Sequence, residues 1–245
     1  MTDENLKEKI KSLLQNKNLK DLDAMIENLI DINKADSDIS HILNWLEEKR
    51  KNCSIKTEEI GINDLDKWKV HPETGIVSHD TGRFFSLIGV RVSGALNREV
   101  SSWTQPMMKQ QETGILGLLS KKINGIRHYL LYAKYEPGNT FKIQLSPTLE
   151  ATDSNLRLFH GGKKPKFAEY FENGGKGKII TSVVSVEDGG RFYLKTNRNM
   201  VVEIPEEENV NVPEEYIWVT SAQLRNLLKL DNAVNSLVRS IIGSS

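Results

Sequence analysis

Residues 114–135 read GILGLLSKKINGIRHYLLYAKY, and the expected fold class is built outward from this segment. Apolar side chains run on both sides of the central pair Asn124-Gly125. This pair suits a type I′ turn, because that turn needs positive φ at both central positions. The stretch therefore predicts an antiparallel hairpin with strands at 118–123 and 126–132.

Short runs of β-branched and aromatic residues after this hairpin predict further strands. Asp188-Gly189 indicates a second hairpin, with strands at 181–186 and 191–194. Two more strands are expected at 141–145 and 200–204, the second of which ends at a proline. The region after residue 57 is therefore expected to be rich in antiparallel strands.

A helix is expected after the last strand. Thr220 and Gln223 form a capping box, and apolar residues at helical spacing continue from Leu224 to Ile241. One long C-terminal helix would cover the sheet. The pattern as a whole predicts the α+β class, with a mixed, mostly antiparallel sheet flanked by helices.

The first fifty residues differ from the rest, because they contain neither glycine nor proline. Their apolar positions predict three amphipathic helices, around 6–14, 22–30 and 39–46. We expect two domains: an N-terminal helical arm over 1–56 and the α+β module over 57–245.

Composition excludes several classes of protein. The 245 residues include 33 Lys+Arg and 33 Asp+Glu, so a basic nucleic-acid binder is not expected. Apolar runs are too short to span a bilayer, and the N-terminus is charged from Asp3 onward, so we expect a soluble, cytoplasmic protein with no membrane partner. A single cysteine, Cys53, allows no internal disulfide, and no Cys/His cluster has the spacing of a zinc site.

The segment after the first hairpin carries the clearest chemical signal. Lys134 and Glu136 stand two residues apart at a strand end, so both should point to the same face. An ammonium beside a carboxylate is suited to proton abstraction next to a carbonyl, where one group takes the proton and the other stabilises the enolate. An ordinary ion pair of little energetic value explains the same residues, and both interpretations stay open.

Other candidate binding residues lie in loops and at strand ends. Arg83 follows a glycine turn, where its guanidinium would bind a phosphate, and Phe85 would stack on a base or sugar. A turn that leads into a strand with core phenylalanines explains the same residues. Trp103 and Gln105 would line a polar pocket with an aromatic wall, or a surface loop. His160 precedes paired glycines and would titrate near neutral pH, although a loop histidine is commonly only exposed.

Taken in order, these segments resemble the NDP-hexose 2,3-dehydratases. The matching runs are 81–85, 103–106, 114–117, 133–139, 144–148, 160–162, 197–200 and 231–232. The resemblance implies a dTDP-4-keto-6-deoxyglucose substrate, loss of water across C2 and C3, and a Nudix-like fold. Nudix hydrolysis is not implied, because the glycine-led helix with clustered glutamates is absent from the sequence.

Family members resemble tandem duplications of this module, whereas each matching run occurs once here. A homodimer would rebuild the two-module arrangement. If only one type of copy is catalytic in the duplicated enzymes, this chain would instead be a catalytically silent nucleotide-sugar-binding subunit. An interaction protein that recruits a partner through its helical arm is a further alternative.

The resemblance and the residue types together suggest roles for individual side chains. Glu136 is the first candidate for the base and His160 the second; Lys134 would stabilise the enolate, and His160 or Tyr135 would protonate the leaving hydroxyl. Arg83 and Arg198 would hold the diphosphate, and Trp103 or Phe85 would stack on the thymine. The residues that would bind sugar hydroxyls and base edges are Gln105, Asn139, Gln144, Asn155 and Asn199. No metal and no redox cofactor are expected, since the chemistry needs neither and no dinucleotide-binding motif is present.

Overall fold

The computed structural model describes residues 5, 12, 36–110, 112–152, 156, 164–172 and 174–244. The expected helices at 6–14 and 22–30 fall almost entirely outside this part of the chain. The third is found as α3 (Ser40–Lys51), whose Ile42 and Leu46 are buried in the core. Within the described residues, no helix is long and apolar enough to cross a membrane.

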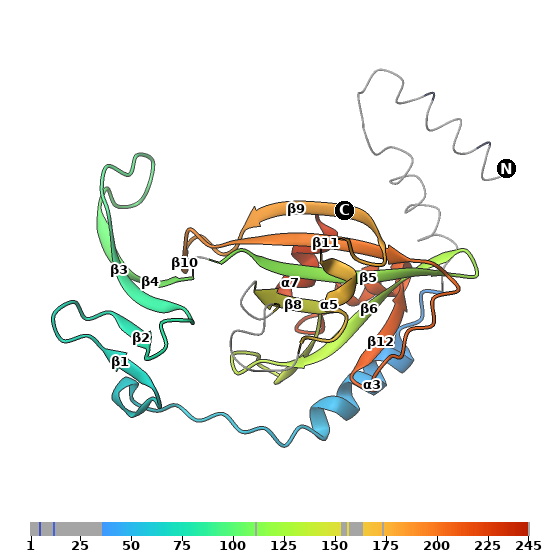
Figure 1. Cartoon of the computed structure of the whole chain (residues 1–245), viewed down its shortest axis with the longest axis horizontal. Helices are drawn as coiled ribbons and strands as arrows, with labels where there is room; N and C mark the ends of the chain where they lie inside the picture. Colours follow the sequence, from blue (N-terminus) through green and yellow to red (C-terminus); the bar gives the residue numbers. More distant parts are fainter. Residues whose placement is uncertain are drawn as a thin grey trace.

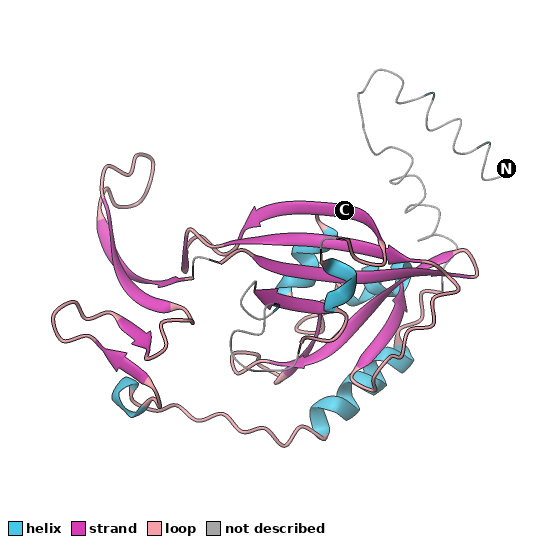
Figure 2. Ribbon diagram, viewed as in Figure 1, coloured by secondary structure: helices cyan, strands magenta, loops and turns pink. Residues whose placement is uncertain are grey.

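The main body is a seven-stranded sheet that confirms the mixed α+β architecture (Figure 2). Its strands are β5 (Gly114–Ile123), β6 (Ile126–Tyr135), β7 (Ile143–Ser146), β8 (Leu149–Thr152), β9 (Lys178–Val186), β11 (Thr196–Ile204) and β12 (Tyr216–Thr220). The strands follow the order β12-β6-β5-β11-β9, with β7 paired to β6 and β8 paired to β5. All of these pairs are antiparallel except β5 with β11.

The first predicted hairpin is confirmed as β5 and β6. Ile123 pairs with Ile126, and Asn124 and Gly125 have φ of 52° and 77°, as a type I′ turn requires. Away from the turn, β5 and β6 stay paired only as far as Leu119 and Leu130.

Beyond that point the two strands separate, and β8 pairs with β5 while β7 pairs with β6. Thr148 lies where they part: its hydroxyl donates to the Leu130 carbonyl and accepts from the Leu119 N–H at 2.9 Å. We call this opening between β7 and β8 the fork.

Helices cover both faces of the sheet. One face packs against α3, α6 (Ser221–Leu227) and α7 (Ser236–Ile242). The other packs against the single turn of α5 (Ala168–Phe171) and an apolar cluster that includes Phe171 and Met200. Gly117 of β5 lies directly beneath Phe171, where an added Cβ would come within 2.4 Å of the ring.

The expectation of one long C-terminal helix is wrong. The capping box of Thr220 and Gln223 is present, but α6 ends at Leu227 and α7 begins only at Ser236. Between them the chain lies along β7: the Leu145 N–H donates to the Ala233 carbonyl, and the Asn235 N–H donates to the Leu145 carbonyl, both at 2.9 Å. These strand-type bonds replace helical ones and carry Asn235 into the fork.

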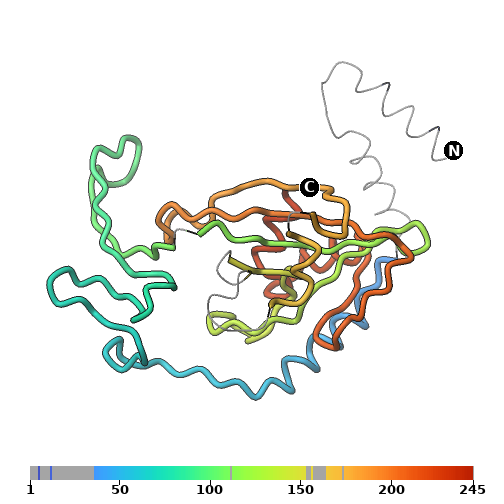
Figure 3. Tube along the Cα trace, in the orientation of Figure 1, coloured from blue at the N-terminus to red at the C-terminus, as the bar shows by residue number. Residues whose placement is uncertain are grey.

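A second, five-stranded sheet lies to one side of the main body (Figure 1). Its strands are β1 (Trp68–Val70), β2 (Val77–His79), β3 (Ser86–Val92), β4 (Trp103–Lys109) and β10 (Phe192–Tyr193), in that order. The segment 52–67, which includes the 3-10 turn η1 (Ile62–Asp64), runs from α3 to this sheet (Figure 3).

The second predicted hairpin is wrong in its pairing. β9 pairs with β11, whereas β10 pairs in parallel with β4 of the second sheet. The cause is the turn at Asp188, whose carbonyl accepts from the N–H groups of Arg191 and Phe192 and turns the chain toward β4. The chain returns to the main sheet at Thr196.

Candidate functional site

Charged side chains gather at the open end of the fork. Lys134 and Glu136 do lie on one side of β6, and Lys134 Nζ donates to Glu136 Oε1 at 3.1 Å. Lys134 also contacts Glu150 Oε2 on β8, across the fork. The ammonium is therefore held between two carboxylates, one directly after β6 and one on β8.

Amide side chains fix the position of Glu136. Asn235 Nδ2 donates to Glu136 Oε2 at 2.7 Å, and Asn139 Nδ2 lies 3.4 Å from the same oxygen. Asn235 also lies 3.5 Å from Gln144 Oε1, while its own Oδ1 caps α7 by accepting from the Leu237 N–H. Four of the residues selected from the sequence, Lys134, Glu136, Asn139 and Gln144, thus belong to one network.

Burial shifts the pKa values of Lys134 and Glu150 in opposite directions. Burial lowers the pKa of Lys134, but the charges of Glu150 and Glu136 outweigh it, and the net pKa lies above the ordinary 10.5. Burial raises the pKa of Glu150 above its ordinary 4.5, because the attraction of Lys134 only partly offsets it and Glu136 and Glu187 add repulsion. Lys134 is thus a firmly charged donor, while Glu150 takes up a proton more readily than an ordinary carboxyl group does.

A cavity of about 300 Å³ adjoins this cluster. Lys134 and Glu150 line one part of it, and Tyr132 and Tyr216 line another, with their rings stacked at 4.7 Å. Burial, with the nearby Tyr132 and Glu215, raises the pKa of Tyr216, so its hydroxyl stays neutral. The cavity is at the small end of the range for ligand pockets, roughly 300–1,000 Å³.

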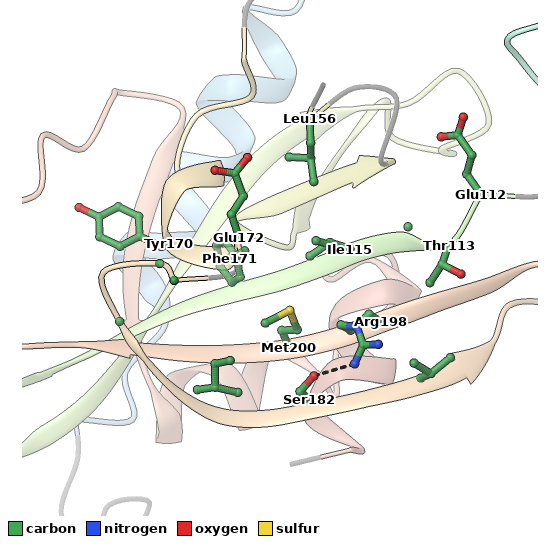
Figure 4. Close-up of a pocket in the computed structure, with 16 residues that line it drawn as sticks. Glu112, Thr113, Ile115, Leu156, Tyr170, Phe171, Glu172, Ser182, Arg198 and Met200 are labelled. Carbon is green, nitrogen blue, oxygen red and sulfur yellow. Dashed lines mark hydrogen bonds between the residues drawn. The ribbon is translucent and has the colours of Figure 1, made fainter. Parts of the chain in front are cut away.

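A larger groove, of about 1420 Å³, lies over β5, β11 and β9 (Figure 4). Arg198 enters it and donates to Ser182 Oγ at 3.2 Å, while Ile115, Phe171 and Met200 supply apolar walls. An exposed guanidinium beside apolar side chains suits a phosphate that carries a flat ring.

The groove and the cavity are neighbours along the paired strands β5 and β8. Leu149, which lines the cavity, pairs with Gly117 of β5, and Gly117 lies beneath Phe171 in the wall of the groove. One elongated ligand could therefore contact both. Within the described residues, no group of three or more His, Cys, Asp and Glu side chains is placed to hold a metal ion.

Two of the predicted site residues point elsewhere. The Tyr135 hydroxyl lies 3.0 Å from Thr57 Oγ1, and as the strand neighbour of Lys134 its side chain takes the opposite face. Asn199 is completely buried, and its Nδ2 donates to Ser185 and Ser240 beneath α7. His160 and Asn155 lie outside the described residues.

The other four predicted binding residues belong to the second sheet and the turn before it, apart from the fork. Trp103 Nε1 donates to Gln105 Oε1 at 2.8 Å, and Gln105 Nε2 donates to the Gly190 carbonyl at 2.7 Å. Phe85 packs against Trp68 at 4.8 Å between ring centroids, and Arg83 is exposed on the turn that precedes β3. Gln105 thereby links the second sheet to the Asp188 turn.

Sequence reasoning missed Glu150 and Asn235 as site residues. Glu150 stands alone among small and apolar residues, in the run Pro147-Thr148-Leu149-Glu150-Ala151. A lone charge in a short apolar strand is the signal that would have identified it. Nothing in the sequence indicates that Asn235 leaves the helix to reach β7.

Solved structures with a related architecture are distant in sequence. The chain is similar to an ADP compounds hydrolase, with 16% identity and a TM-score of 0.39 over 74% of this chain and 96% of that one. It is also similar to a Nudix hydrolase from M. smegmatis, with 17% identity and a TM-score of 0.34 over 54% of this chain and 86% of that one.

Relatives by sequence are much closer. The chain is 41% identical over 198 residues to a dTDP-4-dehydro-6-deoxy-alpha-D-glucopyranose 2,3-dehydratase from Saccharopolyspora spinosa, covering 81% of this chain and 40% of that protein. It is 37% identical over 202 residues to a protein of the same name from Amycolatopsis orientalis, covering 81% and 42%. The chain spans less than half the length of these relatives.

The family model described as NDP-hexose 2,3-dehydratase matches residues 39–244, from α3 to the end of the C-terminal helices. This range contains the fork, the cavity and the groove. The match extends over most of the chain, and the relatives above agree with it. The chain therefore belongs to the NDP-hexose 2,3-dehydratase family.

Proposed function

We propose that this protein removes water across C2 and C3 of dTDP-4-keto-6-deoxyglucose, as a cytoplasmic lyase of deoxysugar biosynthesis. The observation that carries the proposal is the ammonium of Lys134, held between the carboxylates of Glu136 and Glu150 beside a cavity of ligand size. The names of the relatives supply the substrate class.

The first step of the proposed reaction is removal of the C3 proton, which the 4-ketone makes acidic. Glu136 is the base: its carboxylate accepts hydrogen bonds from Lys134 and Asn235, which fix its direction. Lys134 is the donor that stabilises the negative charge growing on the C4 oxygen, and its raised pKa keeps it charged. Neither a redox cofactor nor a metal is required by this step.

The nucleotide is proposed to occupy the groove. Arg198 would bind the diphosphate, and the apolar walls formed by Ile115, Phe171 and Met200 would take the flat base. Arg83 remains a second candidate for the diphosphate, and Trp103 or Phe85 remain candidates for stacking, if the second sheet contacts the ligand.

A homodimer is part of the proposal, with the exposed edge strand β9 as its interface. β9 lies at one end of the strand order, and its only described partner is β11. Long, apolar sheet edges are normally covered in stable proteins. The exposed large side chains on β9, at 43–66% of their surface, are Ile179, Val183, Val184 and Val186.

Two β9 strands would pair antiparallel about a twofold axis. In a register centred between Ser182 and Val183, Lys178 at the start of one strand would face Glu187, just beyond the end of the other. We expect wild-type protein to show twice the chain mass in light scattering, and Val183→Lys to give monomers. Leu96→Lys, at a side chain that is 85% exposed in the loop between β3 and β4, is the control and should stay dimeric. A monomeric wild type would exclude this interface.

The activity is tested by incubating the purified protein with dTDP-4-keto-6-deoxyglucose and a reductant, followed by mass spectrometry. A product lighter by one water before reduction is expected. Glu136→Gln keeps the shape and removes the base, so turnover should fall by roughly 10²–10⁴-fold. An unchanged but bound sugar nucleotide would instead support the silent-subunit alternative, and no binding would contradict the proposed ligand.

A further inference from the structure

We infer that Glu150 is the acid that protonates the departing C2 hydroxyl, an inference that rests on the dehydratase activity proposed above. The proposed base and enolate donor leave this second step without an agent, and hydroxide is a poor leaving group. Of the two acids suggested by the sequence, Tyr135 is bound through its hydroxyl to Thr57 on the other face of the strand, and His160 lies outside the described residues.

Position is the first argument for Glu150. It lines the same cavity as Lys134 and contacts the same ammonium as Glu136, but it comes from the opposite side of the fork. Glu136 borders the cavity only through the ammonium that it binds, so a sugar ring whose C4 oxygen contacts Lys134 would have both carboxyl groups next to that contact. Removal of a proton from C3 and delivery of a proton at C2 require two groups placed in this way.

The hydrogen bonding of Glu150 is the second argument. Its Oε2 contacts Lys134, while its Oε1 is buried and has no hydrogen-bond partner among the residues that the structure describes. A buried carboxylate oxygen without a donor favours the neutral carboxyl group. Burial accordingly raises the pKa of Glu150, and the hydroxyl of a substrate would be the missing partner.

Glu136 differs from Glu150 in this respect. Both of its oxygens accept hydrogen bonds, Oε1 from Lys134 and Oε2 from Asn235, which suits the acceptor-only, ionised form. Two carboxyl groups in unlike surroundings therefore share one cation, and unlike surroundings are how one site keeps an acid and a base apart.

The step balances without another reactant. Glu136 takes the C3 proton, and the C3–H electron pair forms the enolate, with its charge on the C4 oxygen. When the C4 carbonyl forms again, a C2–C3 double bond forms, the C2–O bond breaks, and the Glu150 proton goes to the oxygen that leaves as water. The proton on Glu136 returns to solvent, and Glu150 takes up a new one.

The test separates the two steps by isotope. Each enzyme is incubated with the substrate in D₂O, and deuterium at C3 of recovered substrate and formation of dehydrated product are both measured, against a blank without enzyme. For Glu150→Gln we expect product formation to fall by roughly 10²-fold or more while deuterium exchange at C3 continues. For Glu136→Gln we expect both to be lost.

Glu203→Gln is the matched control. Glu203 is also a mostly buried carboxylate in an ion pair, 18% exposed against 17% for Glu150, but its partner is Arg127 at the other end of the sheet. Glu203→Gln should keep both deuterium exchange at C3 and product formation. Its loss of stability relative to the wild type measures what such a buried ion pair contributes to folding. Glu150→Asp, which keeps the acid, should restore part of the product formation, and it serves where Glu150→Gln folds poorly.

Three results would overturn the inference. Glu150→Gln that dehydrates within tenfold of wild type would show that another group is the acid. Equal loss of exchange and elimination in both Glu150 variants, with dTDP binding intact, would make Glu150 a positioning partner of Lys134. A wild type that forms no product, under conditions where it binds dTDP, would refute the proposed function itself and is thereby distinguished from the other two.

Discussion

Lys134→Met removes the only cation that touches both carboxylates in the described structure of the fork, and keeps a side chain of similar length. Glu136 retains its hydrogen bonds from Asn235 and Asn139. Glu150 is therefore the carboxylate that is destabilised most when the ammonium is removed. Breaking a buried pair by removing one partner typically costs about 3–5 kcal/mol. Uptake of a proton by Glu150 lowers this cost, because a neutral carboxyl group leaves no unpaired buried charge.

The magnitude follows from the pKa. Protonating a carboxyl at its ordinary pKa of 4.5 takes about 3.4 kcal/mol at pH 7, at about 1.36 kcal/mol per pH unit. Burial already raises the pKa of Glu150, so the cost is smaller. We expect Lys134→Met to lower the free energy of unfolding by about 2–3 kcal/mol at pH 7.

The pH dependence has a definite sign. Loss of the Lys134 charge raises the pKa of Glu150 in the folded variant further above its unfolded value, so the variant loses stability as pH rises above 4.5. In the wild type the pKa of Lys134 lies above 10.5, so Lys134 stays charged throughout and adds no slope near neutral pH. The difference in free energy of unfolding between the wild type and Lys134→Met should therefore be small at pH 5 and largest at pH 8.

Urea denaturation followed by tryptophan fluorescence at pH 5 and pH 8 measures this difference. The double variant Lys134→Met/Glu150→Gln removes the orphaned carboxylate and should recover most of the stability lost at pH 8. An equal deficit at both pH values, or a double variant no more stable than Lys134→Met, would refute the idea that Glu150 carries the loss.

Three further predictions concern the fork, the packing and the groove. Thr148→Val leaves one buried N–H and one buried carbonyl unpaired and should lower stability by about 2–5 kcal/mol in thermal unfolding, whereas Thr148→Ser, which keeps the hydroxyl, should lose much less. Gly117→Ala pushes a methyl group against Phe171 and should cost about 1–3 kcal/mol in the same assay; an unchanged melting temperature would contradict the packing. Arg198→Met should weaken dTDP binding in calorimetry by roughly 10–100-fold, with exposed Arg225→Met as the control, and equal affinity would remove Arg198 from the phosphate site.

Local rules account for what the sequence could predict. The Asn124-Gly125 turn and the capping box at Thr220 depend on residues next to each other in the chain, and both are present. The pairing of β10 with β4, and the break between α6 and α7, depend on hydrogen bonds to distant strands, which local propensity does not encode.

The same distinction applies to the site. Lys134 and Glu136 could be paired from a spacing of two in one strand. Glu150 reaches them only because β5 and β6 separate at Thr148 and admit β8 between them. Asn235 reaches them because the chain before α7 adds to the edge of β7. Long-range strand pairing, rather than any motif, assembled the rest of the site.

The side chain of Asn235 makes two kinds of hydrogen bond: its Oδ1 caps α7, and its Nδ2 donates to Glu136. At the other end of the helix, Ser240 accepts a hydrogen bond from Asn199 in β11. A seven-residue helix can open by itself while the sheet stays folded. Each such opening would release Glu136, so we expect the proposed catalytic geometry to be less stable than the sheet. Mild denaturant should then abolish the proposed turnover before the β-sheet circular dichroism changes.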